Sequence, residues 1–417
     1  MAFWSPPVSA VQPLKAAGTR AVLLIALLLA GLAPALADAA GARWVAGFWP
    51  TAQKAGISRS VYNAALGNFT PDPDVLAKAS AQAEFVKPLW EYLDGAVSAK
   101  RLENGREMLK QYDRQLRQIE QAYGVDRSVV VAIWGMESSY GQVLTNDKIV
   151  KNTIRSLATL AYQGGRRAKY GREQLIAALK ILQRGDVTPR GMVGSWAGAM
   201  GHTQFIPTTY QAYAVDFDGD GKRNIWTSEI DALASTANYL AKMGWRHGQT
   251  WGYEVELPAG FDWHHADSGK SLPLDQWRKM GVHRVANRPF PASNETARLY
   301  APAGAGGPAF LLLHNFRVIK RYNNADAYAL GVGHLSDRLR GGNEFVSGWP
   351  RDVRPLAASE RAELQSLLGR HGYYGGSVDG KIGAGTKKAI RSYQASAGMI
   401  PDGYASTGLL QRLRSAR

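Results

Sequence analysis

One apolar helix that carries a single carboxylate constrains this chain more than any other segment. Residues 129–141 read Val-Val-Val-Ala-Ile-Trp-Gly-Met-Glu-Ser-Ser-Tyr-Gly. A helical period of 3.6 residues places four side chains on one face, which are Val130, Ile133, Trp134 and Glu137. The sequence therefore predicts a core helix that buries a carboxyl group close to its C-terminal end.

The position of Glu137 predicts a raised pKa for its carboxyl group. Burial disfavours the charged form, and the partial negative charge of a helix C-terminus acts in the same direction. A glutamic acid that stays protonated near neutral pH can serve as a general acid. The alternative for such a motif is a structural glutamate paired with lysine or arginine.

A second segment, residues 194–207, combines small residues with neutral hydrogen-bonding groups. Ser195 and Gln204 offer such groups without charge, beside aromatic side chains, which suits a sugar better than a phosphate. The alternative is a glycine-rich turn that closes a tight helix packing. His202 is interpreted as a solvent-facing or turn histidine rather than a catalyst.

Residues 216–224 match the start of a calcium-binding loop. Oxygen ligands fall at positions 1, 3 and 5 (Asp216, Asp218 and Asp220), and a glycine follows at position 6. Position 7 offers only the backbone carbonyl of Lys222, and position 12 is Thr227 instead of glutamate, so Glu229 or Asp231 would have to complete the shell. The alternative is a turn stabilised by its own aspartate-to-backbone hydrogen bonds.

The N-terminus predicts export. Lys15 and Arg20 precede an apolar run at residues 21–33, and Ala35-Leu36-Ala37 supplies the small residues of a cleavage site. We therefore expect residues 1–37 to be a signal peptide. The run is shorter than the roughly 20 apolar residues of a membrane-spanning helix, and no later segment is long and apolar enough for one.

Composition narrows the class of partner. The chain has no cysteine, which excludes disulfides, thiol nucleophiles and a cysteine-linked lipid anchor. Its 50 lysines and arginines against 34 aspartates and glutamates give a net charge of +16, which indicates a polyanionic neighbour. Together with the export signal, this favours a polymer of the cell envelope over nucleic acid.

Periodicity and turn residues divide the 417-residue chain into two units. Residues 38–345 are predicted to form a mainly helical domain with a small sheet between 250 and 320, where Tyr253–Leu257 and Phe310–Leu313 read as strands and 287–308 as a surface loop.

Residues 346–356 read as a linker, and residues 357–417 as a small helical module. The module contains a short internal repeat, because Asp379-Gly380 and Asp402-Gly403 each precede a short helical stretch. The predicted fold class is thus mainly α (α+β).

Together these motifs resemble the lytic murein transglycosylase B family, in its soluble secreted branch. The resemblance covers most of the chain and is carried by Glu84-Phe85-Val86-Lys87-Pro88, Ser98, Arg101, Gly105-Arg106, Glu137-Ser138-Ser139-Tyr140-Gly141, Gly198-Ala199-Met200-Gly201 with Gln204, Asp216 to Trp226, and Arg321-Tyr322-Asn323-Asn324. The tail resembles the type 1 peptidoglycan-binding domain through Asp379-Gly380, Thr386, Ala389-Ile390, Tyr393-Gln394 and Asp402-Gly403.

The resemblance implies a lysozyme-like catalytic domain followed by a peptidoglycan-binding domain, with Glu137 as its one catalytic carboxylate. It implies that the substrate-binding residues are Ser195, Gln204, Tyr239, Tyr322 and Asn323. It also implies a calcium site formed by Asp216, Asp218, Asp220, the Lys222 carbonyl and Asp231. Calcium is a candidate structural ion, and the reaction requires no cofactor.

The implied activity is cleavage of the β-1,4 bond between N-acetylmuramic acid and N-acetylglucosamine, with formation of 1,6-anhydromuramoyl ends. Glu137 would act first as general acid and then as general base. The expected location is the periplasm, as a soluble protein on peptidoglycan strands, with other cell-wall enzymes as candidate partners and no membrane span in the mature chain.

Two other functions fit the same residues. A lysozyme-type hydrolase on the same bond needs a second carboxylate, for which Asp216 or Glu229 would be the candidates. A non-catalytic peptidoglycan-binding scaffold would use the tail as its anchor and perform no cleavage.

Overall fold

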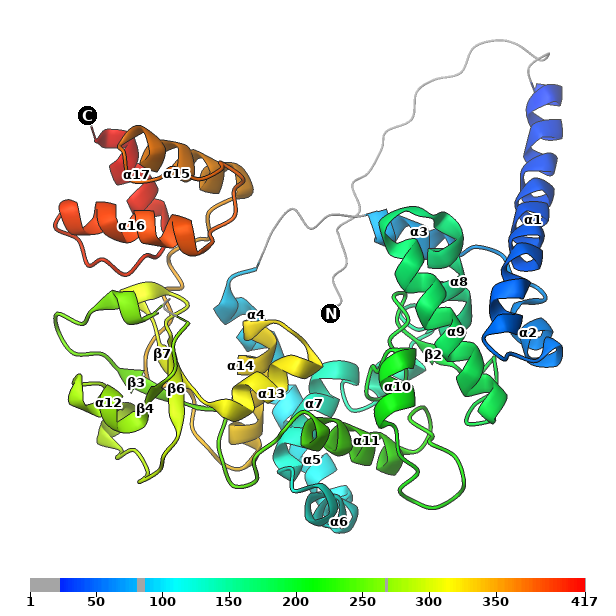
Figure 1. Ribbon diagram of the computed structural model, residues 1–417, viewed down its shortest axis with the longest axis horizontal. Helices are drawn as coiled ribbons and strands as arrows, with labels where there is room; N and C mark the ends of the chain where they lie inside the picture. The colour runs from blue at the N-terminus through cyan, green and yellow to red at the C-terminus, as the bar shows by residue number, and fades with distance from the viewer. Residues whose placement is uncertain (1–22, 81–86, 267–268, 417) are drawn as a thin grey trace.

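The computed structural model describes residues 23–80, 87–266 and 269–416 (Figure 1). Most of the predicted signal peptide and Glu84-Phe85-Val86 of the family motif lie outside the described residues. Of the signal peptide, only the backbone from Leu23 onward is described, as the first part of helix α1 (Leu23–Lys54). Within the described ranges, we find no helix with the length and apolar character that a membrane span requires.

Helices dominate the described chain, which confirms the mainly helical prediction. One group comprises α2 (Arg59–Leu66), α3 (Pro73–Ser80), α8 (Thr153–Gln163) and α9 (Ala168–Arg184). The other comprises α4 (Leu89–Ala96), α5 (Ala99–Gln111), α6 (Asp113–Tyr123), α7 (Arg127–Ser138), α11 (Glu229–Lys242), α13 (His314–Tyr322) and α14 (Asp326–Leu339). Helix α10 (Pro207–Tyr213) contacts both groups, through α9 and α11.

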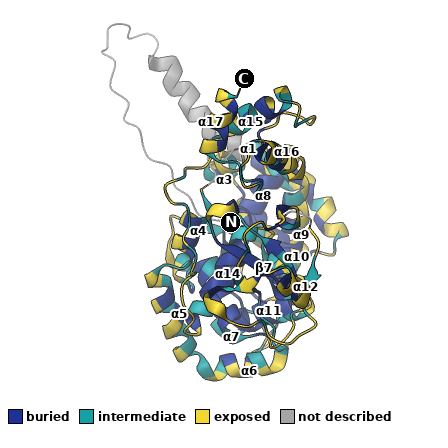
Figure 2. Cartoon of the chain, turned by 90° about the vertical axis from the view of Figure 1, so that its left-hand side faces the viewer, coloured by how far each residue is buried: buried dark blue, intermediate teal, exposed yellow. Residues whose placement is uncertain are grey.

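Helix α7 lies at the centre of the second group, where it contacts α5, α6, α11 and α14. Residues 128–135 are all buried. Three consecutive valines have lower intrinsic helix propensity than alanine or leucine, so burial against four neighbours, rather than local preference, holds this segment helical. In Figure 2 the buried residues gather in the interior, while α5 and α6 present exposed faces outward.

A small antiparallel sheet follows in the order β4-β6-β7-β3-β5. Its strands are β3 (Gly252–Glu256), β4 (Leu272–Pro273), β5 (His283–Arg284), β6 (Thr296–Tyr300) and β7 (Ala309–Leu312). The two predicted strands are confirmed as β3 and β7, which pair with Tyr253 opposite Leu311. The expected loop 287–308 was wrong in part, because it contains β6, which pairs with both β4 and β7.

The sheet joins two hydrophobic cores because alternate side chains of a strand point to opposite faces. Phe310 and Leu312 of β7 belong to the helical core. Leu311 faces a separate core that includes Trp277 of helix α12 (Leu274–Lys279), whose indole N–H donates to the Ala297 carbonyl at 2.9 Å.

The C-terminal module consists of α15 (Ala358–Arg370), α16 (Ala384–Ser396) and α17 (Thr407–Ser415) around its own core. Its internal repeat has a structural basis, since a buried glutamine accepts a hydrogen bond from each Asp-Gly turn. The Gly380 N–H donates to Gln365 Oε1 and the Gly403 N–H to Gln394 Oε1, both at 2.8 Å.

The segment predicted as a linker contains no helix or strand, yet it is held in place. Arg351 forms two hydrogen bonds to the Asp94 carboxylate, at 2.7 and 2.8 Å. The Glu254 carboxylate accepts the N–H groups of Val346 and Ser347, at 2.8 and 2.7 Å. This segment therefore packs against the helical domain and the sheet.

Candidate active site

Helix α7 ends directly after Glu137, in an unusual turn. Ser139, Tyr140 and Gly141 all have positive φ angles, of 50°, 60° and 85°. Two of the three are not glycine, so the turn stores backbone strain that its surroundings must offset. Ser138 helps to fix the turn, because its hydroxyl donates to the His202 carbonyl at 2.9 Å and accepts the Gly141 N–H at 3.1 Å.

The Tyr140 side chain packs against α7, which explains why residues 105 and 135 are glycines. A Cβ atom added to Gly135 would lie 2.6 Å from the Tyr140 ring, and one added to Gly105 would also collide with this side chain. The Tyr140 hydroxyl donates to the Arg101 carbonyl at 2.9 Å, and Arg101 Nε donates to the Gly135 carbonyl at 3.1 Å. These contacts fix the helix end that positions Glu137.

Three tyrosines from different elements lie close enough to Glu137 for its carboxylate to raise their pKa values: Tyr92 of α4, Tyr322 of α13 and Tyr328 of α14. Burial raises the pKa of Glu137, and the nearby Tyr328 hydroxyl opposes part of this rise. Glu137 forms no ion pair with any described residue, so the alternative of a salt-bridged structural glutamate is not what the fold contains.

The hydroxyl of Tyr328 is buried and makes no hydrogen bond of good geometry within the described residues. A buried hydroxyl normally forms a hydrogen bond. The Tyr328 hydroxyl is therefore available to donate to the Glu137 carboxyl group or to a ligand bound beside it. Burial and the Glu137 carboxylate both raise the pKa of Tyr328 well above its ordinary value, so it remains a donor.

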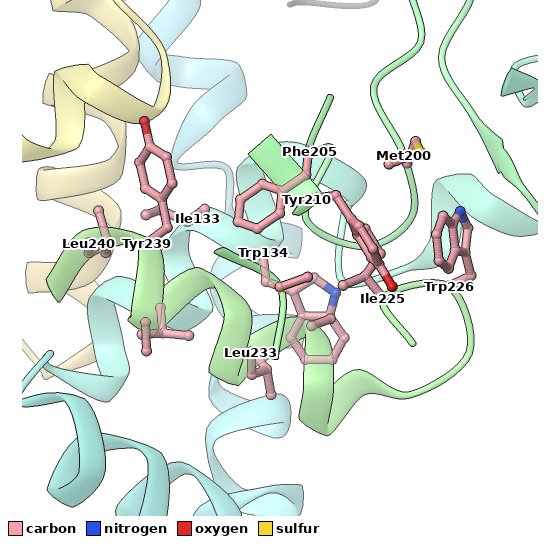
Figure 3. Packing of buried hydrophobic residues seen from close by; sticks show 14 of the residues in the cluster. Ile133, Trp134, Met200, Phe205, Tyr210, Ile225, Trp226, Leu233, Tyr239 and Leu240 are labelled. Carbon is pink, nitrogen blue, oxygen red and sulfur yellow. The ribbon is translucent and has the colours of Figure 1, made fainter. Parts of the chain in front are cut away.

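An aromatic wall continues from Tyr322. The rings of Tyr322 and Tyr239 lie 5.1 Å apart, and each lies 5.7 Å from Phe205. Tyr322 donates its hydroxyl to the Thr203 carbonyl at 2.7 Å, and Tyr239 donates to the Arg321 carbonyl. Figure 3 shows Tyr239 on α11, with the Phe205 ring in the same cluster as Ile133 and Trp134 of α7. The wall thus presents ring faces, while its hydroxyls are engaged by the backbone.

The 194–205 segment forms a compact double hairpin, in which Met200 bridges to both Gly194 and Phe205. Ser195 is buried, and its hydroxyl accepts the Ala199 N–H at 3.1 Å. Gln204 has a φ of 52° and donates its amide to the Gly201 carbonyl at 2.9 Å, which leaves its Oε1 without a partner among the described residues.

The structure brings together some of the predicted site residues and not others. Tyr322 and Tyr239 lie in one cluster with Glu137, and Gln204 adjoins its member Phe205. Ser195 shares the hairpin but makes no described contact with Glu137. Asn323 follows Tyr322 at the end of α13, where its carbonyl accepts the Ala325 N–H at 2.8 Å.

Sequence reasoning missed two residues, Tyr328 and Tyr92, because neither stands in a motif of its own. It also misplaced His202, which is buried and accepts the Trp134 indole N–H at Nδ1, at 2.9 Å. Burial lowers the pKa of His202, so the ring is neutral and acts as a structural acceptor between α7 and the hairpin.

The acidic loop before α11 has the residues that a calcium ion requires. Carboxylate oxygens of Asp216, Asp218, Asp220 and Asp231 lie within 4.8 Å of one another, whereas Glu229 is not part of this cluster. Asp231 is fully buried and accepts the N–H groups of Phe217 and Asn224, each at 2.8 Å.

These residues fit a hard divalent cation, because four carboxylates converge on one point and turns at glycines bring them together. Gly219 and Gly221 have φ angles of 81° and 89°. Lys222 donates its backbone N–H to Asp220 at 2.8 Å and its side chain is exposed, so any ligand it supplies is its carbonyl.

Comparison with known proteins identifies two families. The family model described as "Transglycosylase SLT domain" matches residues 40–337, and the "Putative peptidoglycan binding domain" model matches residues 357–413. The chain is 32% identical to "Membrane-bound lytic murein transglycosylase B" of Escherichia coli (strain K12) over 248 residues, which cover 58% of this chain and 65% of that relative. The chain therefore spans less than two thirds of this curated relative.

Several solved structures are also similar to this one. SltB3 from Pseudomonas aeruginosa, solved in complex with NAG-anhNAM-pentapeptide, is 52% identical with a TM-score of 0.83, over 89% of this chain and 98% of that one. SltB1 from the same organism is 28% identical (TM-score 0.62; 72% and 99%).

Escherichia coli Slt35, solved in complex with calcium, is also 28% identical (TM-score 0.60; 73% and 93%). These matches confirm the resemblance drawn from the sequence motifs. The chain belongs to the transglycosylase SLT domain family.

Proposed function

We propose that this chain is a peptidoglycan lytic transglycosylase. It cleaves the β-1,4 bond between N-acetylmuramic acid and N-acetylglucosamine and leaves a 1,6-anhydromuramoyl end. The observation that carries the proposal is one carboxyl group, Glu137, with a raised pKa beside an aromatic wall. The complexes of its relative SltB3 with peptidoglycan fragments support the substrate class.

Glu137 performs both proton transfers. In its protonated form it donates to the glycosidic oxygen as the bond to C1 breaks, and positive charge develops on the sugar ring. The resulting carboxylate then takes the proton of the C6 hydroxyl, whose oxygen forms the new bond to C1. Water is neither consumed nor released, and Glu137 ends the cycle protonated. The raised pKa of Glu137 favours the first step, and the Tyr328 hydroxyl stabilises the carboxylate needed for the second.

Neutral residues orient the sugar for this internal attack. Holding the C6 hydroxyl close to C1 replaces a bimolecular encounter and lowers the barrier. We assign this role to Ser195, Gln204, Tyr239, Tyr322 and Asn323. Gln204 offers its free Oε1 to a sugar hydroxyl, while Tyr322 and Tyr239 offer ring faces because their hydroxyls already donate to backbone carbonyls.

The lysozyme-type hydrolase is the less favoured alternative, because it needs a second carboxylate beside Glu137. Asp216 is occupied by the N–H groups of Gly219 and Gly221, both at 2.8 Å. Glu229 acts on Tyr112 and His202 and not on Glu137.

Calcium is proposed as a structural ion held by Asp216, Asp218, Asp220, Asp231 and the Lys222 carbonyl. When bound, it would neutralise the four carboxylates and fix the loop before α11, the helix that carries Tyr239. No chemical step uses it.

The organisation of the chain is part of the same proposal. Residues 1–37 direct export to the periplasm, 38–345 form the catalytic domain, 346–356 the connection, and 357–417 the peptidoglycan-binding domain. Other cell-wall enzymes are candidate partners.

The test is mass spectrometry of the fragments that the mature chain releases from purified peptidoglycan, with Glu137→Gln alongside. The proposal predicts fragments lighter by one water than hydrolysis products, and none from the variant. Reducing-end muramic acid would instead establish a hydrolase, and binding without release would establish a scaffold.

A further inference from the structure

A cavity lies between the sheet and the C-terminal half of α14, apart from the tyrosine-lined site. Its volume is about 830 Å³, which is within the range of sites for small ligands. Neither Glu137 nor any of the three tyrosines beside it lines this cavity. His334 of its wall follows Tyr328 on α14 by six residues, or about 9 Å along the helix and on a different face.

The acidic groups of this cavity are paired with the protein, with one exception. Glu254 accepts two backbone N–H groups, and Asp337 accepts the Trp251 indole N–H at 2.8 Å. Glu344 pairs with Arg338 at 2.9 Å. The exception is Glu295, which is paired at one oxygen only: its Oε2 accepts the Ser293 hydroxyl at 3.1 Å, and its Oε1 is buried without a hydrogen-bond partner in the described structure.

Two cations of the cavity have no acidic partner among the described residues. The Arg284 guanidinium lies 4.5 Å from the centre of the Tyr253 ring and donates to the Pro289 carbonyl. Arg288 is exposed, and its charge acts on Arg284. Two neighbouring guanidinium groups without an ion-pair partner attract an anion, while the Glu295 carboxylate, whose charge acts on the same Tyr253 ring, offers a place for a cation beside them.

Unpaired acceptors lie in the same cavity. Besides Glu295 Oε1, the buried Oε1 of Gln249 has no partner in the described chain. His334 is 7% exposed, stacks on Phe345 with ring centres 3.8 Å apart, and has no hydrogen bond to a described residue. Unsatisfied buried polar groups are costly, so a ligand that supplies N–H groups would stabilise this wall.

We infer that this cavity binds a short peptide that carries both free carboxylates and a free ammonium group. The carboxylates pair with Arg284 and Arg288, and the ammonium group lies against Glu295. Tyr253 and Phe290, whose rings lie 5.8 Å apart, provide the apolar surface for the peptide's carbon chain.

The source of this peptide rests on the proposed function, since the peptides of peptidoglycan carry both carboxylates and ammonium groups. A peptidoglycan strand would then bind at two places, with its glycan at Glu137 and one of its peptides between β3 and α14.

The test is isothermal titration calorimetry of the full Glu137→Gln chain with the free tetrapeptide L-Ala-γ-D-Glu-meso-diaminopimelate-D-Ala. This variant measures binding without turnover, so the result can be read even if the proposed cleavage fails. We expect one site per chain. Arg288→Ala and Glu295→Gln should each raise the Kd about two- to fivefold, the upper part of the range of exposed ion pairs. Arg114→Ala removes an exposed arginine of α6 outside the cavity and should leave the Kd unchanged.

The chemical class is tested with a peptide whose carboxylates are amidated and whose ammonium group is acetylated, which should bind at least tenfold more weakly. Three outcomes would overturn the inference. They are absence of binding at millimolar peptide, equal Kd values for both cavity variants and the control, and displacement of the peptide by a peptide-free disaccharide, which would place it in the tyrosine-lined site.

Discussion

Replacing Gly135 by alanine tests how the end of α7 positions Glu137. The added Cβ would lie 2.6 Å from the Tyr140 ring, whose position is fixed by its hydroxyl at the Arg101 carbonyl. Overpacking of this kind costs about 1–3 kcal/mol. Replacing a glycine inside a helix by alanine stabilises the helix by about 1 kcal/mol, because alanine has the higher helix propensity. The net expectation is a loss of about 0–2 kcal/mol in the free energy of unfolding.

Activity should fall much more than stability. Tyr140 belongs to the strained turn that follows Glu137, so displacing it moves the carboxyl group, and a shift of about 1 Å can cost roughly 100-fold in rate. We expect a 10- to 100-fold lower rate on soluble glycan fragments.

The matched control is Gly47→Ala in α1, where a Cβ would meet nothing within 4 Å. It should leave the rate unchanged and stability equal or slightly higher. The measurements are urea unfolding and steady-state cleavage. A Gly135→Ala chain with the rate and stability of wild type would refute the positioning role of Tyr140.

Three further predictions concern charge and metal. Because burial raises the pKa of Glu137 above its ordinary 4.5, the folded chain binds this proton more tightly than the unfolded chain, and the stability contributed by the neutral form is lost as pH rises from 4.5 through the raised pKa. Glu137→Gln should therefore raise the melting temperature at pH 8 and have less effect at pH 4; an equal shift at both would contradict a raised pKa. Tyr328→Phe removes a buried hydroxyl beside Glu137, so it should lower kcat about tenfold and move the alkaline limb of the pH–rate profile upward, while an unshifted profile would exclude this role. Calcium should raise the melting temperature of the wild-type chain, and Asp231→Asn should abolish that response; a response that survives in the variant would place the ion elsewhere.

Features that depend on local pattern could be predicted from the sequence. The helix of Glu137 followed from apolar spacing, and strand β3 from alternation at Tyr253–Leu257. Strand β6 could not be found in this way, because residues 287–308 are rich in glycine and proline and Thr296–Tyr300 becomes a strand only by pairing with β4 and β7.

The site residues also divide into those that a local motif predicts and those that only the fold brings together. Glu137 stands in a motif, but Tyr328 reaches it only because α14 packs against α7, a contact between residues about 190 positions apart. His202 lay in a glycine-rich segment that reads as a turn, and only the fold shows that Trp134 donates to it.

In the proposed reaction the C6 hydroxyl of the substrate, and not water, attacks C1 after Glu137 has donated its proton. Cleavage of purified peptidoglycan in water labelled with heavy oxygen tests this directly. We expect product ends that carry no heavy oxygen and are one water lighter than hydrolysed ends. Incorporation of one heavy oxygen atom at C1 of muramic acid would contradict this expectation and would require a second carboxylate at the site.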